Sequence, residues 1–202
     1  MSKIITISRE FGSGGREIGK RLSEKLGVNY YDREIITKIA EETGFSEQYI
    51  QDISEKGMTP YVFAKSFSMY LSFQGKQTEI LVTQNKILKE IAKNGDAVIV
   101  GRGANVILND YNPMNIFVYA DMESKIKRCR NKAETNEKLT DKEVKNKIIQ
   151  IDKDRKNYHN LISNLEWGDK NNYNLCINTS GIEVKTIISS LANYIDDWFR
   201  KE

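Results

Sequence analysis

The sequence predicts an α/β protein with a parallel sheet that helices cover on both faces. Short apolar segments alternate along the chain with longer segments of helical periodicity. The runs at residues 3–8, 97–100 and 115–119 are apolar throughout instead of at every second residue. Such continuous runs are typical of parallel strands buried on both faces. A length of 202 residues suits one compact domain, and no repeat or linker divides the chain.

The first strand, residues 3–8, leads through a glycine-rich loop into a predicted helix over residues 16–26. Apolar residues recur every four positions in this helix, which indicates one buried side. Gly27 fits its C-terminal cap. Residues 28–31 are expected to form a short second strand.

Asp32 is expected to be the N-cap of a helix over residues 33–42, which Gly44 ends. Another helix is expected to begin at Ser46. Residues 57–75 hold aromatic residues and serines but few charges. They are interpreted as partly helical, either a flexible wall over a cleft or an inserted hairpin packed on the core.

The rest of the chain continues the alternation of strands and helices. Asp121 is expected to cap a helix, and residues 140–143 form a capping box. The highly charged segment 131–142 is a candidate mobile loop or lid. The remaining expected elements are helix 79–93, strand 97–100, strand 115–119, helix 122–133, a helix from the capping box to about residue 160, strand 175–177 and helix 183–200.

Composition excludes several classes of protein. A net charge of +3 is too small to indicate nucleic-acid or membrane binding by itself. The sequence has no apolar run near the ~20 residues that span a bilayer, and its start has no signal-peptide pattern. Cys129 and Cys176 lack metal-binding spacing, so free thiols in a reducing cytoplasm are expected. The single histidine, His159, argues against a Ser-His-Asp hydrolase or a histidine metal site.

The loop in ISREFGSGGREIGKRL, residues 7–22, has the composition of a phosphate-binding loop. Two registers are possible against the G-x-x-x-x-G-K-[ST] pattern, and each departs from it at one or more positions. One uses Gly14, Gly19 and Lys20, but it begins far from the strand and breaks the helical stripe. The preferred register takes residues 9–15 as the loop and starts the helix near Arg16.

In the preferred register, Gly15 stands at the usual lysine position and Arg16 at the usual hydroxyl position. The N–H groups of the loop glycines would hold phosphates, and Arg9 and Arg16 could bind phosphate oxygens through two N–H groups each. Ser13 or Ser8 could offer a hydroxyl. The alternative is a glycine-rich turn with solvated arginines.

Beyond this loop, the chain resembles the cytidylate kinase-like proteins among the P-loop nucleoside monophosphate kinases. The resemblance extends nearly end to end. It rests on the order and spacing of five segments: ISREFGSGGREIGKRL (7–22), YYDREII (30–36), VIVGRGANVIL (98–108), IDKDRKNYH (151–159) and NYNLCINTS (172–180).

The resemblance implies the three-layer P-loop kinase fold: a five-stranded parallel core, a helical acceptor-binding insert and a lid. Within a single domain, it places the insert at residues 45–75 and the lid at 128–155. The core would be residues 1–44, 76–127 and 156–202. It also implies transfer of the γ-phosphate of ATP to a nucleoside monophosphate such as CMP or dCMP, with Mg²⁺ through ligands the sequence does not identify.

Roles for individual residues follow from the same resemblance. Arg102 matches the acceptor-binding arginine, and Gly103 stands where cytidylate kinases usually carry an aspartate. Arg33 joins Arg102 on the acceptor phosphate, and Asp32 could orient the acceptor or Mg²⁺. The loop would bind the donor through Arg9, Gly12, Ser13, Gly14, Gly15 and Arg16, with Arg16 replacing the lysine. The transition state would be stabilised by Arg16, Arg128, Arg130 and Arg155.

Two other functions stay open. A nucleotide-binding regulatory or sensor protein without turnover is consistent with the missing lysine, and a kinase for a different small acceptor is consistent with Gly103. Helix-face or packing roles are open for the lid arginines, and they are favoured for His159, beside Tyr158, and for Trp167.

Overall fold

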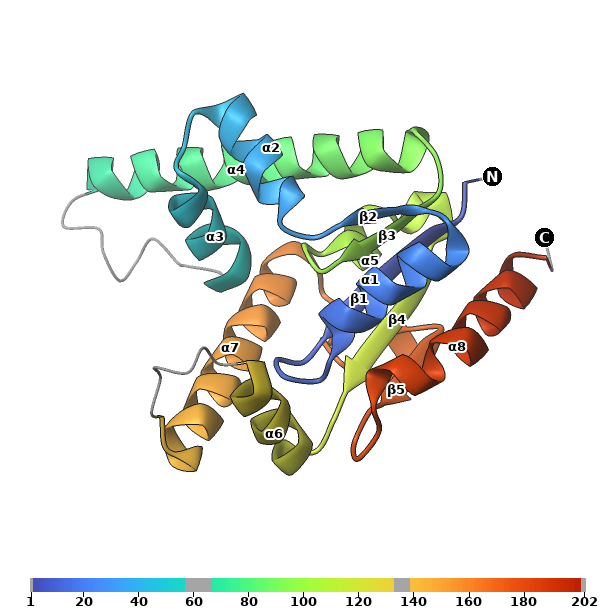
Figure 1. The fold of residues 1–202 in the computed structure, drawn as a ribbon. Coiled ribbons are helices and arrows are strands. Elements are labelled where there is room, and N and C mark those ends of the chain that lie inside the picture. Colours follow the sequence, from blue (N-terminus) through green and yellow to red (C-terminus); the bar gives the residue numbers. More distant parts are fainter. Residues whose placement is uncertain (1, 57–66, 133–138, 201–202) are drawn as a thin grey trace.

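A computed structural model describes residues 2–56, 67–132 and 139–200 of the chain (Figure 1). The elements follow in the order β1 (Ile4–Arg9), α1 (Gly15–Leu26), β2 (Asn29–Tyr31), α2 (Glu34–Thr43), α3 (Glu47–Lys56), α4 (Phe67–Lys93), β3 (Ala97–Val100), α5 (Ala104–Ile107), η2 (Asn109–Tyr111), β4 (Met114–Tyr119), α6 (Met122–Lys132), α7 (Asp141–Ile162), η3 (Lys170–Asn172), β5 (Leu175–Asn178) and α8 (Val184–Phe199).

The strands form one sheet in the order β2-β3-β1-β4-β5, and every neighbouring pair is parallel. β1 lies in the middle, so both faces and both edges of this strand are covered. The register pairs Ile7 with Val100 of β3 and Arg9 with Val118 of β4. The loops that follow β1 and β3 therefore emerge side by side at the carboxyl edge of the sheet, where α/β proteins usually bind ligands.

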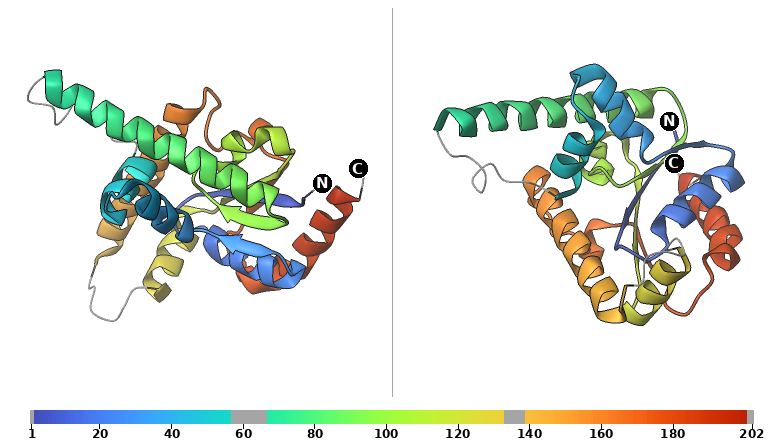
Figure 2. Two further views of the ribbon diagram at one scale, coloured as in Figure 1. Left: turned by 90° about the horizontal axis from the view of Figure 1, so that it is seen from above. Right: turned by 60° about the vertical axis from the view of Figure 1, so that its left-hand side comes forward.

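Helices cover the two faces of the sheet, and alternate residues of each strand enter different cores. Ile5 and Ile7 pack with α1 and α8, whereas Ile4 packs with α2, α3 and α4. Figures 1 and 2 show α1 and α8 together on one side and the long α4 on the other. The predicted α/β architecture with a parallel sheet between two helical layers is confirmed.

The helix ends show how well local signals predicted the chain. Gly27 and Gly44 end α1 and α2 in the left-handed conformation, at φ 68° and 70°. The capping box at Thr140 is present. The prediction for Asp32 is wrong: the N-cap of α2 is Arg33, and the Asp32 side chain instead pairs with Arg16 of α1.

Two helices differ from expectation. α4 begins at Phe67 instead of residue 79, and α5 was not predicted because it has only one turn. Helices run without a break through residues 75–76 and 155–156, where the expected insert and lid end. Residues 57–66 of the expected cleft wall and 133–138 of the expected lid lie outside the described residues.

Candidate functional site

The glycine loop, residues 9–15, joins β1 to α1 as the preferred register predicted. Gly12 and Gly14 have φ of 77° and 85°, which glycine adopts at little cost. α1 begins at Gly15, and no side chain caps it. The first N–H groups of an uncapped helix need an acceptor, and the helix dipole adds positive charge there. This end of α1 can therefore bind an anion such as a phosphate.

The loop packs so closely that two of its glycines have no room for a side chain. A Cβ at Gly15 would lie 2.5 Å from the Cβ of Arg9, and one at Gly14 would lie 2.7 Å from Val184 Cγ2. Gly15 is the position at which a phosphate-binding loop usually carries lysine. The packing therefore gives a physical reason for the missing lysine.

Hydrogen bonds inside and behind the loop hold its shape. The Ser13 hydroxyl donates to the Glu10 carbonyl at 2.8 Å, and the Thr179 hydroxyl donates to the Ser13 carbonyl at 2.7 Å. Arg128 donates to the carbonyls of Thr179 and Ile182, the latter at 3.0 Å. In this structure the Ser13 hydroxyl and the Arg128 guanidinium thus stabilise the loop and its neighbour after β5.

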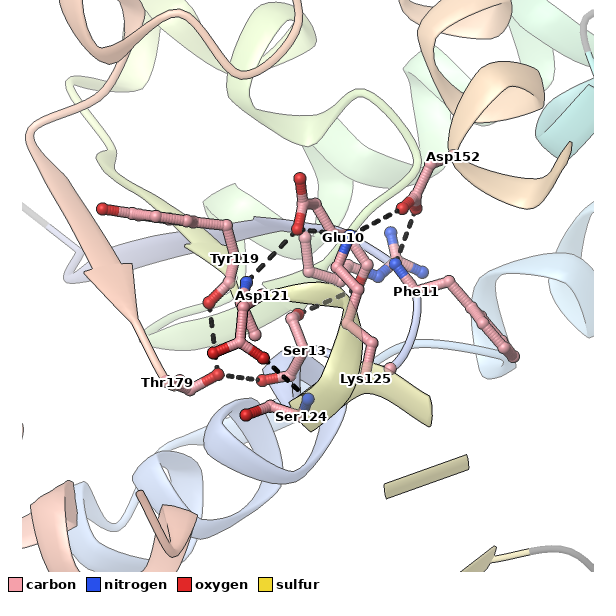
Figure 3. Close-up of polar contacts among 12 residues, drawn as sticks. Glu10, Phe11, Ser13, Tyr119, Asp121, Ser124, Lys125, Asp152 and Thr179 are labelled. Atoms are coloured by element: carbon pink, nitrogen blue, oxygen red, sulfur yellow. Dashed lines mark hydrogen bonds and ion pairs between the residues drawn. The ribbon is translucent and has the colours of Figure 1, made fainter. Parts of the chain in front are cut away.

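A buried ion network lies against the same loop (Figure 3). Lys125 of α6 has a side chain that is only 6% exposed; its Nζ lies 2.6 Å from Glu10 and 3.2 Å from Asp152 of α7. The other oxygen of Asp152 accepts from the Phe11 N–H at 2.6 Å. Burial raises the pKa of Asp152, while the Phe11 N–H and Lys125 oppose that rise. The network joins α6 and α7 to the loop.

Arg16 lies at the start of α1 and pairs with a buried carboxylate. Its Nε is 2.5 Å from Asp32 Oδ2, and its side chain is half exposed. Asp32 Oδ1 is buried without a hydrogen-bond partner among the residues the structure describes. Burial, with the Asp32 charge as a smaller contribution, raises the pKa of the nearby Tyr30 to about 12. Arg16 is therefore held beside the loop by Asp32.

A pocket opens next to the loop, at the carboxyl edge of β1 and β3. We call it the arginine pocket. It is lined by Ser8, Arg9, Gly101, Arg102, Gly103, Asn105, Arg155, Tyr158, His159 and Trp167. Arg9 is the last residue of β1, Arg102 lies in the turn after β3, and Arg155 lies on α7. Arg155 donates to the Arg9 carbonyl at 3.0 Å, so α7 is tied to the end of β1. Three guanidinium groups in one pocket favour an anionic ligand.

The strained turn after β3 fixes Arg102 in this pocket. Arg102 has a φ of 57°, and Gln84 of α4 donates to its carbonyl at 3.0 Å. Gln84 also donates to the Tyr158 hydroxyl at 2.5 Å, and burial raises the pKa of Tyr158 to about 12. Gly103 has a φ of 62°, and a Cβ there would meet the end of Ile162. An aspartate at this position would have to adopt a strained backbone and displace that side chain.

His159 contributes an imidazole to the same pocket. The residue is 3% exposed, and neither ring nitrogen has a hydrogen-bond partner in the described part of the chain. Burial lowers its pKa below the ordinary 6.5, and a weak interaction with the backbone of Leu165 only partly offsets this. His159 is therefore neutral at pH 7.

The structure brings some of the predicted site residues together and separates others. The loop residues and Arg16 lie at the start of α1, and Arg9, Arg102 and Arg155 line one pocket. Arg33 is exposed at the start of α2. Arg130 pairs with Asp141, with its Nε 2.6 Å from the carboxylate, beside the start of α7.

Sequence reasoning did not assign site roles to Lys125, Asn105, His159 or Trp167. Two signals were available: His159 is the single histidine of the sequence, and both Asn105 and His159 fall within segments on which the family resemblance rests. Trp167 packs edge-on against Phe117 at 5.3 Å, as its expected packing role requires, but it also lines the pocket.

Comparisons with known proteins agree with this geometry. A curated cytidylate kinase of Methanocaldococcus jannaschii is 26% identical over 96% of this chain and 98% of its own. A cytidylate kinase of Ignicoccus hospitalis is 22% identical over 93% and 96%. A solved structure of an uncharacterised Eubacterium ventriosum protein is 28% identical, with a TM-score of 0.68, and the match covers 96% of this chain and 98% of that one.

A more distant structure supports the fold alone. A shikimate kinase of Bacteroides thetaiotaomicron is 15% identical, with a TM-score of 0.57 over 97% and 99% of the two chains. The expected P-loop kinase fold is therefore confirmed, and fold and family together support a phosphotransferase. No helix in the described residues is long and apolar enough to cross a membrane. The cytidylate kinase-like family model matches residues 4–181, and the chain belongs to that family.

Proposed function

We propose that the protein transfers the γ-phosphate of ATP to a nucleoside monophosphate similar to CMP or dCMP. The observation that carries the proposal is the arginine pocket, which opens beside the glycine loop at one edge of the sheet. In the reaction, the bond between the γ-phosphorus and the ADP oxygen breaks. A bond from the same phosphorus to an acceptor phosphate oxygen forms. Positioning and positive charge supply most of the catalysis in such transfers.

The donor phosphates would bind at the glycine loop. The uncapped start of α1 fits a phosphate that approaches main-chain N–H groups. Arg16 would leave Asp32 and take the place of the lysine. Mg²⁺, when bound, would neutralise phosphate charge, and the buried Asp32 Oδ1 is a suitable oxygen ligand for it.

The resemblance implied a donor role for Arg9 and a transition-state role for Arg155. Because both residues line one pocket with Arg102, the acceptor phosphate would bind between these three arginines. We keep residues 45–75 as the proposed insert and 128–155 as the proposed lid, with Arg33 reaching the acceptor from α2. Arg128 and Arg130 would act on the transition state only after leaving the carbonyl and carboxylate groups that they bind in this structure. The binding partners of the protein would be small nucleotides. Its location would be the cytoplasm.

A second candidate is a nucleotide-binding protein without turnover. Gly15 has no room for the lysine side chain, and Arg16 is engaged by Asp32. Both features are consistent with a loop that binds phosphate but does not stabilise the transferring group.

The test is ADP formation from Mg-ATP with CMP, dCMP, UMP, AMP or GMP. We expect acceptor-dependent turnover that falls about 100-fold in Arg16→Ala, because one transition-state cation is lost. Arg21→Ala is the matched control, since Arg21 lies on α1 in an exposed ion pair with Glu17. It should change turnover less than twofold. Binding of ATP without turnover on any acceptor would favour the second candidate.

A further inference from the structure

His159 lies in the arginine pocket with hydrogen-bonding capacity that the described residues leave unused. The residue is 3% exposed, and neither ring nitrogen has a hydrogen-bond partner among the described residues. Burying a polar group without a partner is unfavourable, and most buried polar groups in proteins are satisfied. A ligand that enters the pocket can supply the missing partner.

The form of the imidazole decides what it can bind. The charged groups that line the pocket around it are Arg9, Arg102 and Arg155, and all three are cations. Buried among cations, the imidazole stays neutral and presents one N–H donor and one acceptor nitrogen. The arginines suit the anionic part of a ligand, whereas neutral His159 suits an uncharged polar group.

The neighbours of His159 indicate which part of the acceptor that group belongs to. Trp167 is partly exposed and lines the same pocket beside the buried Tyr158. Flat bases stack on aromatic rings, and they carry their donors and acceptors at the edge. A base would therefore meet the Trp167 ring and a neutral imidazole in one place.

We propose that His159 is a specificity-determining residue, which hydrogen bonds the polar edge of the acceptor's base while the pocket arginines hold its phosphate. This inference rests on the proposed function, since it requires a nucleoside monophosphate as acceptor. It assigns base recognition to α7, in a chain that has Gly103 where the usual aspartate would stand.

The test is calorimetric binding of CMP and of ribose 5-phosphate, which lacks the base. His159→Phe keeps a ring but removes both hydrogen-bonding nitrogens. We expect it to weaken CMP about tenfold, the effect of losing one hydrogen bond, and to leave ribose 5-phosphate unchanged. His159→Gln keeps a donor and an acceptor and should stay within about threefold for CMP. Asn160→Ala, at the exposed next position, is the control.

The possible outcomes distinguish a failure of the role of His159 from a failure of the proposed function. If His159→Phe weakens both ligands equally, the residue only shapes the pocket, and the inference is overturned. The same holds if CMP binds the wild type and His159→Phe alike. If the wild type binds none of the five nucleoside monophosphates of the activity panel, the proposed function fails first. Circular dichroism of each variant confirms that the comparison is made between folded proteins.

Discussion

Gly15 is the residue at which the geometry of the loop is most restrictive. Its missing Cβ would lie 2.5 Å from the Cβ of Arg9, and both atoms are fixed by the backbone. We expect Gly15→Ala to destabilise the fold by about 1–3 kcal/mol, because overpacking forces the backbone to shift. Urea unfolding measures the change in free energy.

The control is Gly75→Ala, at a helical glycine in α4 that has nothing within 4 Å of its would-be Cβ. Alanine favours the helix there, so this variant should gain up to about 1 kcal/mol. Equal effects of the two substitutions would contradict the steric argument for Gly15. They would also mean that packing does not explain the missing lysine.

Residue patterns predicted the glycine loop but not the partners of its charged groups. Arg16 was identified as a phosphate-binding candidate, and the structure shows that Asp32 already holds it. Aspartate is a residue type that often caps helices, so Asp32 before a helical segment is a local signal in the sequence. Its pairing with Arg16 depends on β2 lying beside the start of α1, and a contact of that kind leaves no periodic trace in the sequence.

At the scale of elements, Lys125 connects α6 to the loop and to α7. Its ammonium is buried between Glu10 and Asp152. We expect Lys125→Met to cost about 3 kcal/mol, because it removes the cation between two partly buried carboxylates and leaves Asp152 with only the more distant Arg155, at 3.6 Å. Lys127→Met is the matched control on the exposed side of α6 and should stay within about 0.5 kcal/mol.

The pH dependence of the stability lost in Lys125→Met identifies the cause of that loss. Lys125 lowers the pKa of Asp152, so its removal should raise that pKa further. A carboxyl with a raised pKa in the folded state costs stability once it is ionised. The penalty of Lys125→Met should therefore be largest at neutral pH and shrink as the pH falls. A penalty that does not change with pH would indicate lost packing instead of unpaired charge.

Elements with strong end signals were predictable, and those without were not. Asp121 caps α6 by accepting from the Ser124 N–H at 2.7 Å, and the capping box at Thr140 starts α7. Both depend on residues within one turn. The start of α4 at Phe67 was missed because residues 67–75 carry few of the charges that mark an exposed helix face.

At the scale of the whole molecule, the fold gathers residues from distant parts of the chain into the arginine pocket. Arg9 ends the first strand, Arg102 lies in the turn after the third strand, and Arg155 lies on α7. The order of the parallel strands makes the first two neighbours, and local sequence patterns do not encode that order. The side of α7 that enters the pocket depends on its packing against the core, so the place of His159 could not be predicted.

The free energy of unfolding should depend on the protonation of His159, because it is the only histidine in the chain. Its pKa in the folded protein lies below the ordinary 6.5, so the unfolded chain takes up a proton first as the pH falls. The free energy of unfolding should therefore decrease as the pH drops through 6.5, by at most about 1.4 kcal/mol per pH unit. The decrease should level off below the folded pKa. Urea unfolding between pH 8 and 5 measures this slope, and His159→Gln should abolish it. If the slope persists in His159→Gln, another group titrates there, and the buried neutral imidazole is not its source.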